Sequence, residues 1–293
     1  MTRRGPLFII ASVQKIISAA EMREIDRLTA ERYATPTLLL MEAAGASVAR
    51  HVAANLDENL SRRSVLVLCG RGNNGGDGAS AARALWREGA RVDVLLFGRV
   101  DETKGDARTN FEMVRRLASF EAGSRERPSL LSFVECDSTG AWEEFASRRR
   151  AYDVLIDALF GTGLKRPLEG LFRQVVEHLS LMREAREHAG ESLPLVVSVD
   201  IPSGLDADSA APIGPAVRAA LTVTFTAPKP ANVLPPAADL GGRLHVAHLG
   251  SPQTLLDAAP STLFLAEDED ARRFLERTRY APGSYKNKHG HAL

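Results

Sequence analysis

The chain has 293 residues, 44% of them hydrophobic, which is enough for one large domain with a sizeable core. Its 37 lysines and arginines balance its 37 aspartates and glutamates, so no net charge favours nucleic acid or an anionic membrane, and small molecules are the expected partners. Two cysteines are too few for a disulfide framework, and no apolar run approaches the roughly 18 residues of a membrane helix, which favours the cytoplasm. A signal peptide is the weaker alternative, because Gln14 and Lys15 close the apolar part of MTRRGPLFIIASVQK early.

Two helices are expected first, with apolar residues at three- and four-residue spacing, and Ser18 with Glu21 forms a capping box where the first begins. Short apolar strands then alternate with helices. The predicted helices lie at 18–33, 37–59, 77–89, 105–119, 140–150 and 169–189, and the predicted strands at 65–69, 92–97, 131–135, 154–159, 195–200, 221–226 and 243–249.

The strands are apolar almost throughout, as a parallel sheet covered on both faces requires. Their spacing suits strand–helix–strand crossovers, so the expected class is α/β with a doubly wound sheet. The last two strands follow no long helical pattern and are expected to extend the edge of the same sheet. Ligands of such sheets bind at the carboxyl ends of the strands, where three polar loops are expected to converge.

The first loop, RGNNGGDG at 71–78, fits the G-x-G-x-x-G spacing of dinucleotide-binding loops when counted from Gly70. Gly98 and Arg99 stand where a ribose-binding acid belongs, and no Lys-Ser/Thr pair follows, so the dinucleotide and P-loop patterns are both incomplete. The glycines are expected to permit positive φ and close approach of backbone N–H groups to a ligand. Asp77 would repel a phosphate; we expect it to cap the helix and to hold a ribose hydroxyl or a cation, with capping alone as the alternative.

The second loop, GTGLKRP, is the better phosphate candidate, because it joins flexible backbone to Lys165 and Arg166. Two solvated surface cations are the alternative. Asp157 precedes this loop inside an apolar strand and needs either a hydrogen-bonding partner or a bound cation. The third loop begins with Asp200, which is placed for acid–base work. Ser203 lies in P-S-G, which is not a hydrolase nucleophile elbow.

The segments NNGGDG, DALFGTGL, VDIPSGLDAD and TVTFTAPKP, in this order, resemble the NAD(P)H-hydrate epimerase family, also called the YjeF N-terminal domain. The likeness runs from about Ile16 to Pro252. It implies a Rossmann-like three-layer αβα sandwich with a mostly parallel sheet and two leading helices. It also implies isomerase activity that interconverts R and S NADHX and NADPHX, which are nucleotides hydrated at nicotinamide C6.

The resemblance also assigns residues. We expect Asp200 to be the acid–base group and Lys165 a second catalytic candidate, and a potassium ion to be held by Asn74, Asp157 and Ser203, whose oxygens suit a hard cation. The residues expected to bind substrate are Asn73, Asn74, Gly75, Gly76, Asp77, Gly161, Thr162, Gly163, Leu164, Lys165, Arg166, Pro167 and Asp200.

Residues 1–15 are expected to be an extension, 16–252 the epimerase domain and 253–293 a tail. The end, YAPGSYKNKHGHAL, resembles the opening of an ADP-dependent dehydratase domain, so a truncated bifunctional protein or a chain that lost this domain is expected, with functional coupling to a dehydratase. A homodimer is one expected state. The alternatives are a non-catalytic scaffold module of the same fold and an NADP-dependent oxidoreductase, which Asp77 and the missing ribose acid disfavour.

Overall fold

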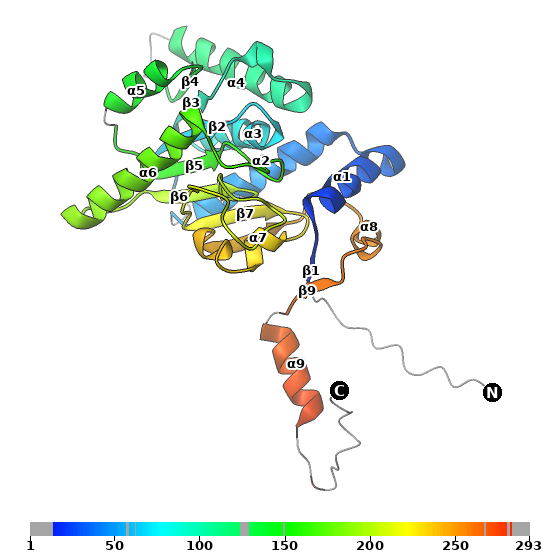
Figure 1. Cartoon of the computed structure of the whole chain (residues 1–293). Helices are drawn as coiled ribbons and strands as arrows, with labels where there is room; N and C mark the ends of the chain where they lie inside the picture. Colours follow the sequence, from blue (N-terminus) through cyan, green and yellow to red (C-terminus); the bar gives the residue numbers. More distant parts are fainter. Residues whose placement is uncertain are drawn as a thin grey trace.

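The computed structural model describes residues 14–56, 59–61, 63–123, 129–148, 150–266, 268–279 and 282. Within these ranges the centre of the molecule is a seven-stranded sheet with the strand order β4-β3-β2-β5-β6-β7-β8, in which every neighbouring pair is parallel (Figure 1). The strands are β1 (Gln14–Ile16), β2 (Ser64–Cys69), β3 (Arg91–Leu96), β4 (Leu131–Glu135), β5 (Val154–Ala158), β6 (Leu195–Val199), β7 (Leu221–Phe225), β8 (Arg243–Ala247) and β9 (Leu263–Leu265).

Helices cover both faces of this sheet, which confirms the predicted α/β sandwich. None of the helices in the described part of the chain has the length and apolar character of a bilayer span. The helices are α1 (Ala19–Tyr33), α2 (Thr37–Ala54), α3 (Asn73–Arg87), α4 (Gly105–Gly123), α5 (Thr139–Ser147), α6 (Gly170–Ala189), α7 (Pro230–Val233), α8 (Gln253–Asp257) and α9 (Asp268–Thr278).

The two-residue period of a strand explains the two layers of the core. Val65 and Val67 of β2 pack with α2, α3 and α4, while Leu66 and Leu68 face the other layer, built from α5 and α6. All four side chains are buried, so β2 needs apolar residues at every position. This is why its sequence reads as one continuous apolar run rather than as an alternation.

The order in which the chain adds strands to the sheet reverses between β2 and β5. From β2 the chain builds outward through β3 and β4, and from β5 it builds the opposite way through β6, β7 and β8. The loops after β2 and β5 therefore leave the sheet on opposite sides and open a crevice at their carboxyl ends. The first two polar loops of the sequence stand at this crevice.

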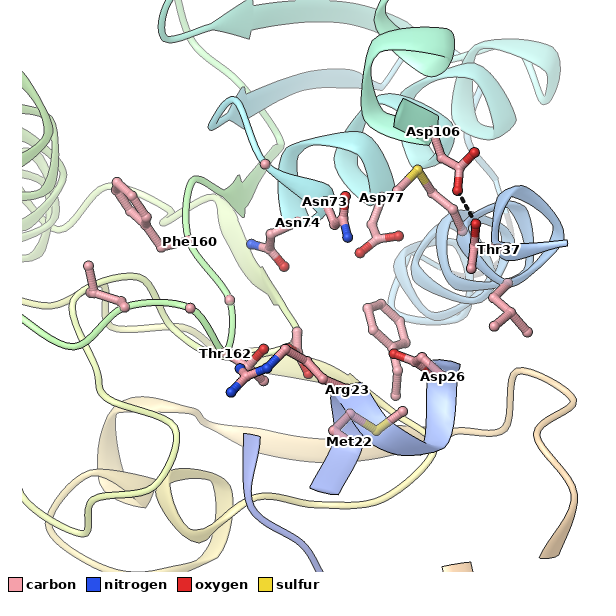
Figure 2. Close-up of a pocket in the computed structure, with 18 of the residues that line it drawn as sticks. Met22, Arg23, Asp26, Thr37, Asn73, Asn74, Asp77, Asp106, Phe160 and Thr162 are labelled. Carbon is pink, nitrogen blue, oxygen red and sulfur yellow. Dashed lines mark hydrogen bonds between the residues drawn. The ribbon is translucent and has the colours of Figure 1, made fainter. Parts of the chain in front are cut away.

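Helix α3 begins four residues earlier than the sequence pattern predicts. Its N-cap is Gly72, which makes no side-chain cap, so the opening turn is formed by Asn73, Asn74, Gly75 and Gly76. The prediction that Asp77 caps the helix is therefore wrong, because Asp77 lies past the first turn and its side chain points sideways into the crevice (Figure 2).

The glycines of this loop serve packing rather than positive φ. None of the glycines from Gly70 to Gly78 has a positive φ, so that part of the expectation is wrong. A Cβ at Gly75 would overlap the Gly70 carbonyl oxygen, and a Cβ at Gly78 would lie 2.5 Å from the Cβ of Ala158. The glycine spacing thus lets α3 lie directly against β2 and β5.

Helix α1 is held over the carboxyl edge of the sheet. Ser18 and Glu21 form the predicted capping box, and the backbone N–H of Ala19 donates to Asp208 Oδ1 at 2.7 Å. Helix α8 packs against α1 through buried Leu255 and Leu256, and β9 pairs with β1 in an antiparallel ribbon that the sequence pattern does not predict. The boundary at residue 252 stays a prediction. The prediction that the second helix continues to 59 is wrong, because α2 ends at Ala54 with Asn55 as its C-cap.

Candidate active site

A cavity of about 610 Å³ occupies the crevice between the ends of β2 and β5 (Figure 2). Its size is that of a typical small-molecule site. The walls come from α1, the start of α2, the first turn of α3, the loop after β5 and the end of β7. The cavity therefore lies where an open α/β sheet binds ligands.

Asp200 is fixed at the wall of this cavity by bonds to both its backbone and its side chain. Its N–H donates to Val223 O at 2.8 Å, and Asn232 Nδ2 donates to its carbonyl oxygen at 3.1 Å. These bonds hold Asp200 at a φ of 66°, a left-handed conformation that costs free energy for a residue with a side chain. The strain is evidence that this carboxylate must point in one direction.

Lys229 is the buried cation that faces Asp200. Its Nζ donates to Asp200 Oδ1 at 2.8 Å, to Thr224 Oγ1 at 2.9 Å and to Phe225 O at 3.0 Å, which uses all three of its protons. The lysine side chain is 1% exposed and that of Asp200 is 12% exposed. Thr224 Oγ1 also donates to Oδ1 at 2.9 Å. Oδ1 is thus occupied, while Oδ2 has no hydrogen-bond partner among the described residues.

Asp157 lies beneath the cavity floor and is satisfied by hydrogen bonds. It accepts from Ser203 Oγ at 2.5 Å, from Ser203 N at 2.8 Å and from Ser198 Oγ at 2.9 Å. Ser198 is its direct neighbour on β6. Burial raises the pKa of the Asp157 carboxyl, and the bonds from Ser203 and Ser198 oppose that rise. Protein partners thus already meet the need that the sequence analysis identified for this residue.

The Asn74 side chain lines the cavity. Its Nδ2 is buried and has no hydrogen-bond partner within the described residues. Its Oδ1 and Asp200 Oδ2 both lie close to Gly161, since a Cβ there would be 2.9 Å from the first and 3.1 Å from the second. A side chain at 161 would therefore push the Asn74 amide or the Asp200 carboxylate out of its present position.

Three further carboxyl groups line the cavity, from Asp77 of α3, Asp26 of α1 and Asp106 of α4 (Figure 2). Burial, followed by the negative charges of Asp200 and Asp26, raises the pKa of Asp77 well above its ordinary value. Burial also raises the pKa of Asp26 to about 6, although the charge of Lys229 opposes this. Carboxyl groups of different proton affinity therefore face one cavity, an arrangement that supports acid–base chemistry.

The structure brings most of the expected substrate-binding residues together. Lys165 is held instead by Asp206 at 2.6 Å and Asp208 at 2.7 Å, and the expected ligands Asp157 and Ser203 lie behind the wall. Neither Gly75 nor Gly76 lines the cavity, and neither do Lys165, Arg166 and Pro167. The expected residues that do line it are Asn73, Asn74, Asp77, Gly161, Thr162, Gly163, Leu164 and Asp200.

Sequence analysis did not assign Lys229, Arg23 or Asp26 to the site. Lys229 stands in the quoted segment TVTFTAPKP, where a lysine between two prolines just after an apolar strand was the available signal. Arg23 and Asp26 are three apart on α1 and so share a face of that helix. Only the tertiary placement of α1 across the crevice shows that this face meets the cavity.

Comparison with known proteins identifies a family and several proteins that the chain resembles in sequence. The family described as YjeF-related protein N-terminus matches residues 37–231. A bifunctional NAD(P)H-hydrate repair enzyme Nnr from Thermofilum pendens is 42% identical over 83% of this chain and 41% of its own length. An NAD(P)H-hydrate epimerase from Rhodopirellula baltica is 34% identical over 82% of this chain and 86% of its own.

A solved structure shares the fold. Yeast ynu0 superposes with a TM-score of 0.64 at 26% identity, over 87% of this chain and 98% of that one. The chain spans less than half the length of the bifunctional relatives, with 41% of two of them covered and 48% of a third.

Proposed function

This chain belongs to the family of YjeF-related protein N-termini, and we propose that it is an NAD(P)H-hydrate epimerase that interconverts R and S NADHX and NADPHX. The observation that carries the proposal is Asp200, a strained and tightly anchored carboxylate with one oxygen left for a ligand in the cavity. The names of relatives that this chain covers over most of their length support the same reaction.

The reaction inverts the carbon of the nicotinamide ring that carries the added hydroxyl. That carbon loses its configuration either when the ring opens or when the hydroxyl leaves, and it regains a configuration when the bond re-forms. Either route moves a proton, and the reverse step returns it, so the site needs one group to accept and one to donate.

Asp200 and Asp77 meet these two needs. Hydrogen bonds from Lys229 and Thr224 occupy Oδ1 of Asp200 and leave Oδ2 to accept a proton from the substrate. Burial and neighbouring negative charge keep a proton on Asp77, which can then donate it. One carboxyl group that accepts a proton beside another that donates one is a recurring solution for acid–base catalysis. Lys165, whose ammonium is held by two aspartates, contributes no proton transfer in this scheme.

We also propose that the site holds a potassium ion between Asn74, Asp157 and Ser203. The supporting observation is that Asn74 Nδ2 is buried and has no hydrogen-bond partner among the described residues. A 180° flip of the amide would exchange Nδ2 and Oδ1 and so put an oxygen where Nδ2 now lies. Oxygens of an amide, a carboxylate and a hydroxyl together suit a hard cation. When bound, the ion would supply positive charge next to the substrate and would favour the ionised form of Asp157.

The test is a coupled assay in which a mixture of R and S NADHX is incubated with a dehydratase that consumes only the S form. Complete consumption after addition of this protein, against partial consumption without it, supports the epimerase. No change on addition contradicts the proposal and favours a scaffold role. The names of the bifunctional relatives make a dehydratase the natural functional partner.

A further inference from the structure

In the part of the chain that the structure describes, one cation of the cavity, Arg23, has no protein partner. Arg23, Arg71 and Lys229 are the basic residues that line it in the described part of the chain. Lys229 is committed to Asp200, and Arg71 Nη1 donates to Glu102 at 3.2 Å. Arg23 forms neither a hydrogen bond nor an ion pair with any described residue; its charge acts only at longer range, where it helps to lower the pKa of Asp208.

The cations expected to meet phosphate are used elsewhere. Two carboxylates, Asp206 and Asp208, hold Lys165, and neither Lys165 nor Arg166 lines the cavity. Asp208 also accepts a hydrogen bond from the N–H of Ala19 at the start of α1. Lys165 thus stabilises the anchor of α1, and α1 in turn carries Arg23 to the cavity.

Backbone donors stand at the same cavity. Gly161, Thr162 and Gly163 line it, and their N–H groups donate to no acceptor among the described residues. Figure 2 shows Arg23 and Thr162 in one part of the cavity and Asp77 and Asp106 in another. Arg23 and these N–H groups are therefore donors without an acceptor in the described part of the cavity, and an anionic group of a ligand is favoured beside them.

We propose that Arg23, together with the N–H groups of Gly161, Thr162 and Gly163, binds the diphosphate of the substrate. The inference rests on the proposed function for the identity of the substrate, which carries a diphosphate one ribose away from its reacting ring. A guanidinium offers paired donors that match phosphate oxygens, and the neighbouring N–H groups add further donors.

The experiment compares three single substitutions. R23Q removes the charge from the cavity, R27Q removes a charge from the same helix where Arg27 pairs with Glu24 and Glu31 outside the cavity, and K165Q removes the originally expected cation. We expect R23Q to raise the KM for NADHX by about 10- to 100-fold, the usual range for a charged hydrogen bond, with kcat changed less than threefold. R27Q is expected to keep the wild-type KM and kcat.

A binding measurement without turnover separates this inference from the proposed function. ADP-ribose, which carries a diphosphate, is titrated calorimetrically into wild type and R23Q; we expect R23Q to weaken its binding by a similar factor. Binding that R23Q weakens in a protein without epimerase activity would refute the function and leave the subsite standing. Wild-type KM and ADP-ribose affinity in R23Q, with both impaired in K165Q, would overturn the subsite. Arg23 has no hydrogen-bonded partner among the described residues, so the melting temperature of R23Q should match that of wild type.

Discussion

The buried pair of Lys229 and Asp200 makes a strong prediction for the substitution K229M. Methionine has nearly the length of lysine but no charge, so the change leaves little empty space and removes three hydrogen bonds. Asp200 would then be a nearly buried carboxylate without a counter-charge. Removing one partner of such a pair costs about 3–5 kcal/mol, and we expect this loss in the free energy of unfolding.

The double variant D200N/K229M isolates the pair. Because it removes both charges, we expect it to be about 2–3 kcal/mol more stable than the sum of the two single changes predicts. K165M is the matched control, since Lys165 binds one oxygen of each of two carboxylates but is 47% exposed. Its substitution should lower the free energy of unfolding by at most about 1 kcal/mol. Urea unfolding followed by circular dichroism measures all four free energies. A loss below about 1 kcal/mol in K229M would refute the reasoning.

Two other predictions concern stability. Burial raises the pKa of Asp26 from its ordinary value of 3.8 to about 6 in the folded chain. Between these two values the folded state keeps a proton that the unfolded state releases. The free energy of unfolding therefore falls as the pH rises from about 4 to about 6. D26N should abolish this fall and stabilise the chain at pH 7 by about 1–2 kcal/mol in urea unfolding, after allowance for solvent in the cavity; an unchanged pH profile would contradict it. G78A should lower the free energy of unfolding by about 1–3 kcal/mol in thermal unfolding, because the added Cβ meets Ala158 and Cys69. G140A is the control: it has open space around it and should stabilise α5 by up to about 1 kcal/mol. Equal effects of the two substitutions would contradict the packing role of Gly78.

The layers of the fold are predictable because their signal is local. The continuous apolar strands and the three- and four-residue spacing of the helices follow directly from which faces must be buried. Even β7 and β8, which lack long connecting helices, are found at the edge of the sheet as expected. The β1–β9 ribbon was missed because each strand has three residues and their pairing joins opposite ends of the chain.

The start of α3 shows where local patterns fail. Glycines and asparagines disfavour helix interiors, so NNGGDG predicts a loop. These residues are helical in the structure because Gly75 and Gly78 allow α3 to pack directly on β2 and β5. Helix propensity describes single residues and does not include the free energy of this tertiary packing. The consequence for the site is that Asp77 faces the cavity rather than the end of its helix.

The site was predictable where strand ends carry polar residues and unpredictable where distant elements meet. Asp200 and Asp157 stand out because each carboxylate belongs to an apolar strand. Arg23 and Lys165 lie far apart in sequence, and only the folded chain shows that Asp208 holds the second while the first reaches the cavity. Opposite charges in loops can satisfy one another, and a sequence does not show which of them do.

The rate of interconversion between R and S NADHX in wild type and in D200N tests the central claim most directly. The asparagine keeps an oxygen that can accept hydrogen bonds from Lys229 and Thr224, but it cannot accept the substrate's proton. Circular dichroism at the assay temperature checks that D200N is folded. If the single variant unfolds, D200N/K229M replaces it in the assay. We predict active wild type and a loss of about 100-fold or more in folded D200N. A folded D200N with nearly wild-type rate would contradict the assignment of Asp200 as the acid–base group.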